Sequence, residues 1–106
     1  MQKDRILSML GLAAKAGKIV SGEFSTEKAI KSGKAFLVIV SEEASENTKK
    51  IFRDKCSFYE IPIYLYASKE MLGNAIGRQF RASLAVLDPG FANSLEEKLK
   101  IAVKTE

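Results

Sequence analysis

The run FLVIV, residues 36–40, decides the fold class of this 106-residue chain. It consists entirely of apolar residues that favour strands, with no polar residue between them. A strand of this kind is covered on both faces, as in a sheet with helices above and below it. We therefore expect residues 36–40 to form an inner strand of a layered α/β fold.

Helical and strand-like patterns alternate on both sides of this run, as their apolar spacing shows. Helices are predicted over residues 4–15 and 23–32, after Ser45, over residues 68–76 and after the turn at residues 88–90. Strands are predicted over residues 18–20, 36–40, 61–67 and 84–87. About five helices and four short strands make a layered α/β domain with helices on both faces of a small sheet. We expect one domain, residues 1–106.

Three side-chain assignments follow from position within these elements. Cys56 lies on the inward stripe of its helix, so we interpret it as a buried small hydrophobe and not as a nucleophile. Pro62 must lie at a strand start or on an edge strand, because it cannot donate a ladder hydrogen bond. The last helix is expected to bury one face, made of Phe91, Leu95, Leu99 and Ala102.

The composition excludes several classes of chemistry. With one cysteine and no histidine, the chain lacks an internal disulfide, an imidazole metal ligand and every nucleophile that depends on histidine. Neither of the glycine-rich phosphate-loop motifs occurs. We therefore expect a protein that is not an enzyme and that holds no cofactor or metal.

The longest apolar run, residues 35–40, is far shorter than the roughly 20 residues of a membrane span. The first ten residues have mixed charge and no long apolar core, so no secretion signal is recognised. We expect a cytoplasmic protein with no membrane partner.

The net charge of +4 is unevenly distributed. Residues 1–40 hold seven Lys or Arg against three acids, whereas the rest of the chain holds ten of each. A polyanion partner explains this asymmetry, because neutralised phosphates release counterions. A lysine-rich solubilising surface explains it equally well.

Two segments are candidates for anion binding. The stretch VSGEFSTEKAIKSGKA, residues 20–35, begins a helix whose free N–H groups and dipole suit a phosphate. Lys28 and Lys31 lie along that helix, with Lys18 and Lys34 at the edges of the region.

The second segment, GNAIGRQFRAS at residues 73–83, places Arg78 and Arg81 on either side of Phe80 in a loop. Basic residues beside an aromatic ring hold phosphate and stack on unpaired bases. In the other interpretation, which we favour slightly, Phe80 packs into the core and the arginines are solvated.

The carboxylates allow one further arrangement. Glu42 and Glu43 follow the buried strand, and Asp88 follows the last strand, so the three side chains are candidates for a metal or acid–base site at one sheet edge. We favour the simpler interpretation, in which both glutamates stabilise the N-terminal end of the next helix.

The order G-x-x-x-x-x-K-A-I-x-x-G-K-A-x-L-V-I-V-x-E-[DE]-A in residues 22–44 resembles the kink-turn-binding ribosomal proteins of the L7Ae/L30e type. Residues 61–77 and 82–92 resemble later segments of the same family, and NTKKIFRDKC with FANSLEEKL is most similar to its bacterial YlxQ-type branch. The resemblance implies a three-layer α/β/α sandwich with a small central mixed sheet of about four strands. It also implies an RNA-binding surface built from the start of the second helix and the loop after the fourth.

Members of this family carry G-x-N-E-x-x-K at the helix start, where the Asn–Glu pair reads base edges in a kink-turn. Gly22 and Lys28 match this motif, whereas Phe24 and Ser25 occupy the Asn and Glu places. Phenylalanine has no hydrogen-bonding group, and serine is shorter than glutamate. The departure argues against kink-turn specificity and leaves RNA binding as such.

The leading hypothesis is a non-enzymatic, ribosome- or rRNA-associated protein that binds structured RNA, with ribosomal or translation proteins as further partners. The predicted RNA-binding residues are Gly22, Phe24, Ser25, Lys28, Lys31, Arg78, Phe80 and Arg81. The alternative is a protein-interaction module on the same fold, which predicts a contiguous apolar patch beyond the needs of the core. The residues to inspect for it are Phe24, Phe80 and Phe91.

The role of Phe24 has two interpretations. The ring stacks on a base, or it packs as a hydrophobic staple against the helix that begins there. We slightly favour the staple.

Overall fold

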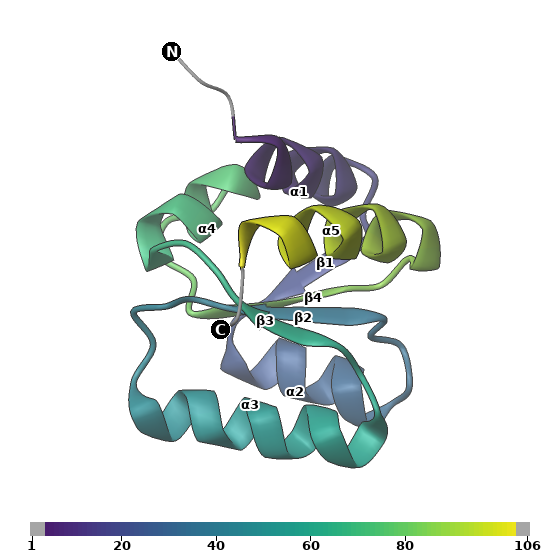
Figure 1. Cartoon of the computed structure of the whole chain (residues 1–106), viewed down its shortest axis with the longest axis vertical. Coiled ribbons are helices and arrows are strands. Elements are labelled where there is room, and N and C mark those ends of the chain that lie inside the picture. Colours follow the sequence, from purple (N-terminus) through teal and green to yellow (C-terminus); the bar gives the residue numbers. More distant parts are fainter. Residues whose placement is uncertain (1–3, 104–106) are drawn as a thin grey trace.

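The computed structural model describes residues 4–103, so the two ends of the expected domain lie outside the described residues. The elements are, in chain order, α1 (Arg5–Lys15), β1 (Ile19–Ser21), α2 (Glu23–Lys31), β2 (Leu37–Val40), α3 (Glu46–Tyr59), β3 (Ile63–Leu65), α4 (Lys69–Ala75), β4 (Ser83–Val86) and α5 (Pro89–Ala102). They form three layers, with α1, α4 and α5 on one face of the sheet and α2 and α3 on the other (Figure 1). The predicted α/β/α sandwich is confirmed.

The four strands form a mixed sheet in the order β1-β4-β2-β3. Strand β2 pairs antiparallel with β4 and parallel with β3, so Val38 faces Ala85 on one side and Ile63 on the other. Every residue of β2 and of β4 is buried. The uninterrupted apolar run is therefore explained as expected: β2 is an inner strand that is covered on both faces.

The side chains of β2 divide between two cores. Leu37 and Ile39 join the core beneath α1, α4 and α5, and Val38 and Val40 join the core above α2 and α3. Cys56 is fully buried in the second core, and this burial raises the pKa of its thiol to about 11. The thiol stays protonated at neutral pH, as expected for a structural cysteine.

Four helices begin at the polar residues that the sequence places before them. In each case the side-chain oxygen of the residue preceding the helix accepts a hydrogen bond from a backbone N–H of the first turn. These N-cap residues are Asp4, Ser45, Ser68 and Asp88.

Several expected bounds, and one expected burial, differ from the structure. The strand predicted over residues 61–67 is only Ile63–Leu65, because Pro62 precedes the edge strand and Ala67 turns the chain with a φ of +69°. The inner strand begins at Leu37, since Phe36 is 44% exposed. Ala102 is exposed, whereas Leu95 and Leu99 of the same helix are buried in the core.

Candidate nucleic-acid interface

The start of α2 depends on the backbone conformation of Gly22. This residue precedes the helix with φ of +92° and ψ of +157° and provides no side-chain cap. Residues that carry a side chain rarely adopt these backbone angles. The space that a Cβ would take is nevertheless open, since apart from the neighbouring residues no atom lies within 4 Å of it. Glycine is therefore required by the turn, and the surface above it is open.

The first turn of α2 is fixed to the sheet. The Gly22 N–H donates to the Ser83 carbonyl at 3.0 Å, and the Ser83 hydroxyl lies 3.4 Å from the buried hydroxyl of Thr26. Strand β4 thereby holds the helix start in place, so Phe24 and Ser25 project from a rigid turn.

The loop between α4 and β4 is held just as firmly against α4. The Arg78 N–H donates to the Gly73 carbonyl at 2.7 Å, and the Arg81 N–H donates to the Lys69 carbonyl at 3.1 Å. Gly73 is buried, and a Cβ on it would overlap the Gln79 carbonyl group. Because Gly73 has no side chain, the loop backbone can pack directly against α4.

Arg81 joins these two segments. Its Nε donates to the Ser21 Oγ at 2.9 Å, and its Nη1 donates to the Phe80 carbonyl at 2.8 Å. A polar hollow of about 350 Å³ lies at this junction, and Ser21, Ser25, Arg78 and Arg81 line it. The structure therefore brings Ser25 together with both predicted arginines.

Ser21 belongs to this surface although it was not predicted from the sequence. A serine at the end of a short strand carries no signal of its own, and its partner Arg81 lies 60 residues away in the chain.

Phe24 lies beside this hollow and is 77% exposed. The staple interpretation is wrong, because the second residue of α2 points away from the buried face formed by Thr26, Ala29 and Ile30. Phe24 lines a second hollow of about 310 Å³ together with Ser25, Lys28 and other residues. The remaining lining residues of that hollow are Val20, Ala29, Ser32, Lys34 and Leu87.

Lys31 is less available than the sequence suggested. Its Nζ lies 3.2 Å from a Glu27 carboxylate oxygen that also lies 3.1 Å from the Lys55 Nζ. Hydrogen bonds from Lys55 and then Lys31 hold the pKa of the Glu27 carboxyl below its usual range. Within residues 4–103, by contrast, Lys28 and Lys34 form no ion pair.

Phe80 is 64% exposed, so the interpretation that placed it in the core is wrong. Its ring leaves the core because the loop backbone, rather than its side chains, packs against α4. Phe91 behaves differently, since it is partly buried against the core beneath α1 and α5. The patch of three phenylalanines that a protein-interaction module predicts is therefore not formed.

The acidic residues do not converge on a site. Asp88 accepts from the Phe91 N–H at 2.9 Å as the cap of α5, and Glu43 accepts from the Lys69 N–H at 3.1 Å. Glu43 thus stabilises the start of α4 and not that of α3, which corrects the interpretation from sequence. In the described part of the chain, no three acidic, cysteine or histidine side chains are grouped to hold a metal ion.

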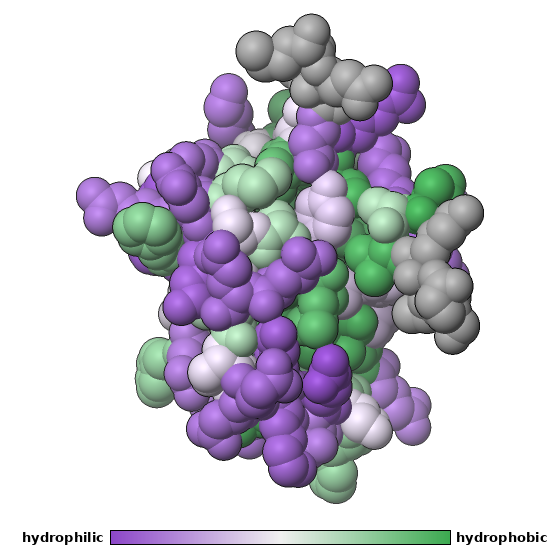
Figure 2. Space-filling model, turned by 60° about the vertical axis from the view of Figure 1, so that its left-hand side comes forward, coloured by the Kyte–Doolittle hydropathy of each residue, from purple (hydrophilic) through white to green (hydrophobic). Residues whose placement is uncertain are grey.

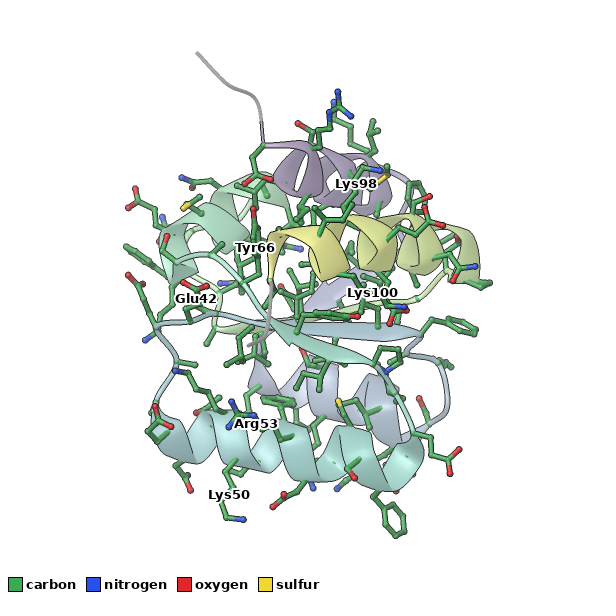
Figure 3. All side chains as sticks on the ribbon, in the orientation of Figure 1. Glu42, Lys50, Arg53, Tyr66, Lys98 and Lys100 are labelled. Carbon is green, nitrogen blue, oxygen red and sulfur yellow. The ribbon has the colours of Figure 1, made fainter. Side chains whose placement is uncertain are left out.

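Cationic side chains outside the candidate interface are dispersed. Lys98 and Lys100 lie on α5, and Lys50 and Arg53 lie on α3 on the opposite side of the sheet (Figure 3). Lys50 is paired with Asp54 at 3.0 Å. At the start of α2 and in the α4–β4 loop, cationic side chains lie beside the exposed rings of Phe24 and Phe80.

A larger hollow of about 560 Å³ lies elsewhere, between the start of α1 and the end of α5. Two acids and two bases line it (Asp4, Arg5, Glu97 and Lys98), so it has no preference for a polyanion. Tyr66 reaches toward this region in Figure 3, and its hydroxyl donates to Asp4 Oδ2 at 2.6 Å.

Over residues 4–103, none of the helices has the length and apolar character needed to cross a bilayer.

A small basic α/β/α sandwich that unites cationic side chains from two distant segments has the features of a nucleic-acid-binding protein. The sequence gives the family directly. Residues 4–96 match the Ribosomal protein L7Ae/L30e/S12e/Gadd45 family, and the chain belongs to it.

Two relatives carry the name RNA-binding protein YlxQ. The one from Bacillus subtilis (strain 168) is 46% identical over 87 residues, which are 82% of this chain and 87% of the relative. The one from Enterococcus faecium is 37% identical over 98 residues, which are 92% of this chain and 94% of the relative. The family and these relatives point to a non-enzymatic protein of the YlxQ-like branch, as expected.

Two solved structures share the fold. A Bacillus halodurans protein of unknown function superposes with a TM-score of 0.90 at 40% identity and covers 92% of this chain and 99% of its own. The 15.5kD RNA binding protein of Giardia lamblia superposes with a TM-score of 0.77 over 97% of this chain and 94% of its own. At 19% identity the second likeness concerns the fold alone.

Proposed function

We propose that this chain is a cytoplasmic, non-enzymatic protein that binds structured RNA and associates with ribosomes or ribosomal RNA. The RNA lies across the start of α2 and the α4–β4 loop. Gly22 permits close approach of the RNA backbone, Lys28 and Arg78 contact phosphates, and the other predicted residues complete the surface. The ribosomal family and the RNA-binding names of the two bacterial relatives support this proposal.

One observation carries the proposal, namely the hollow in which Ser25 meets Arg78 and Arg81. These residues are far apart in the sequence, and the Arg81–Ser21 hydrogen bond holds their segments together. Such a concave, cationic junction with an exposed phenylalanine on each segment suits a folded RNA backbone with unpaired bases.

The same geometry favours general RNA recognition over kink-turn recognition. Phe24 presents a ring that can neither donate nor accept a hydrogen bond to a base edge. We therefore expect similar affinities for a kink-turn duplex and for other structured RNAs that offer unpaired bases.

Fluorescence anisotropy tests the proposal with a kink-turn duplex, the same duplex without its bulge, and a structured ribosomal RNA fragment. Each RNA is titrated at two salt concentrations. Binding should weaken steeply with salt, because each phosphate contact contributes about 0.9 to the slope of log K against log salt concentration. Lys28→Ala should lower the affinity for all three RNAs and reduce that slope by about one unit.

Lys100→Ala is the matched control, since it removes the same charge from α5, away from the candidate interface. It should leave the slope nearly unchanged. Equal effects of the two substitutions would show that net charge, and not this surface, drives binding. No binding of the parent protein to any of the three RNAs would refute the proposed function.

A further inference from the structure

Phe24 has the most exposed apolar side chain of the candidate interface, and no polar interaction explains this exposure. It is 77% exposed at the start of α2, so it forgoes the stabilisation that burial of a phenylalanine normally gives. A single exposed apolar residue is ordinary on a protein surface. Its surroundings are what distinguish Phe24.

The Phe24 side chain lines two hollows. One of about 310 Å³ also contains Lys28 and Lys34, and another of about 350 Å³ contains Lys28 and Lys31. Ser25, the next residue, opens into the polar hollow of Arg78 and Arg81. The ring therefore borders spaces that carry cationic side chains.

Two acids lie at the start of α2: Glu23, in the first turn, is exposed, whereas Glu27 does not oppose a polyanion. Glu27 is held between Lys31 and Lys55, which keeps its charge locally neutralised. Among residues 4–103, Lys28 and Lys34 take part in no ion pair, and so both remain available for phosphate.

The surface around Phe24 is both apolar and cationic. Figure 2 shows a face on which hydrophilic side chains predominate, with apolar side chains in its upper half and centre and a few that stand alone. The hollow of about 310 Å³ beside Phe24 combines the apolar Val20, Ala29 and Leu87 with the cationic Lys28 and Lys34. An unpaired nucleotide combines the flat apolar face and the negative charges that match this setting.

We infer that Phe24 is a stacking platform for one unpaired base of the bound RNA, with the flanking phosphates held by Lys28 and Lys34 on one side and by Arg78 on the other. This inference rests on the proposed function and specifies its ligand. Because every base has a face that stacks and the ring cannot read a base edge, the site accepts an unpaired base of any identity.

A thermodynamic cycle between ring and base tests the inference. The RNA is the bulged kink-turn duplex, prepared with a normal base or with an abasic residue at each bulge position in turn. Loss of stacking on Ala substitution typically weakens binding by roughly five- to 150-fold. Phe24→Ala should produce a loss in this range with the intact RNA and little further loss with the abasic RNA at the stacked position.

Two variants complete the design. Phe24→Trp should restore the affinity and quench a 2-aminopurine placed at the stacked position. Phe58→Ala should change nothing, since Phe58 is 79% exposed near the end of α3 and is a matched control for loss of an exposed phenylalanine. Replacing one base by another at the stacked position should change the affinity much less than removing the base.

The possible results distinguish failure of the stacking inference from failure of the proposed function. If the parent binds RNA and Lys28→Ala weakens binding while Phe24→Ala does not, the stacking inference is wrong and the proposed function stands. If the losses from Phe24→Ala and from the abasic residue multiply at every bulge position, ring and base act independently, and the inference is again overturned. If the parent binds no RNA, both fail together.

Discussion

Replacing Gly73 by alanine should destabilise the protein, although alanine is the better helix former. Gly73 lies within α4, where the change would by itself stabilise the helix by about 1 kcal/mol. An alanine Cβ, however, would overlap the Gln79 carbonyl group and lie 3.1 Å from the Phe80 nitrogen. Backbone atoms of a pinned loop cannot yield as the end of a flexible side chain does, so the loop must move.

The size of the effect follows from what that movement breaks. Displacing the loop lengthens the hydrogen bonds from Arg78 to Gly73 and from Arg81 to Lys69, each with a net value of about 1 kcal/mol. Overpacking adds about 1–3 kcal/mol. After subtraction of the gain in helix propensity, the free energy of unfolding should fall by about 2–4 kcal/mol.

Urea denaturation of the parent and the Gly73→Ala variant measures this difference. Gly90→Ala is the control, because the added Cβ in α5 meets only the Asp88 side-chain oxygen, at 3.1 Å, and the change should stay within about 1 kcal/mol. Faster amide exchange at Arg78 and Arg81 should accompany the loss in Gly73→Ala. A Gly73→Ala variant as stable as the parent would refute the claim that the loop rests on α4.

Two further predictions concern other hydrogen bonds. Ser21→Ala removes the partner of the Arg81 Nε; it should lower RNA affinity severalfold without changing the salt slope, whereas a reduced slope would show that Ser21 affects a phosphate contact directly. The pKa values of Tyr64 and Tyr66 are raised to about 12 by burial and then by hydrogen bonds to Glu96 and Asp4. Because the unfolded-state pKa is near 10, the stabilisation is complete below about pH 10 and is lost as the pH rises toward 12. Thermal melts of the parent and of the variant with both tyrosines replaced by phenylalanine should converge across this range, and parallel curves would contradict the assignment.

Patterns confined to one element predicted most of the fold. The capping residues lie next to the helices that they cap, as Asp4 and Ser45 do, and the apolar spacing reports directly which side of an element is buried. The edge strand alternates between the two cores, with Ile63 and Leu65 in one and Tyr64 in the other. The predicted ends of elements were wrong by one or two residues where the backbone of a loop turns the chain, as it does at Ala67 with its positive φ.

The same patterns predicted only part of the candidate site. Charge asymmetry and the family resemblance selected the start of α2 and the α4–β4 loop. The exposure of Phe24 and Phe80 was misjudged, because a phenylalanine next to a helix or in a loop gives the same local pattern whether its ring is buried or free. Likewise, the sequence offers no sign that Glu43 contacts α4 across 26 residues of chain.

The sequence by itself determined the kinds of elements, their inward faces, the family and the chemistry that is absent, because each depends on residue identity and short-range spacing. The tertiary structure alone decided the strand order, the union of Ser25 with Arg78 and Arg81, and the exposure of Phe24. These features depend on contacts such as that between Ser21 and Arg81, which form only when segments 60 residues apart pack on the same sheet.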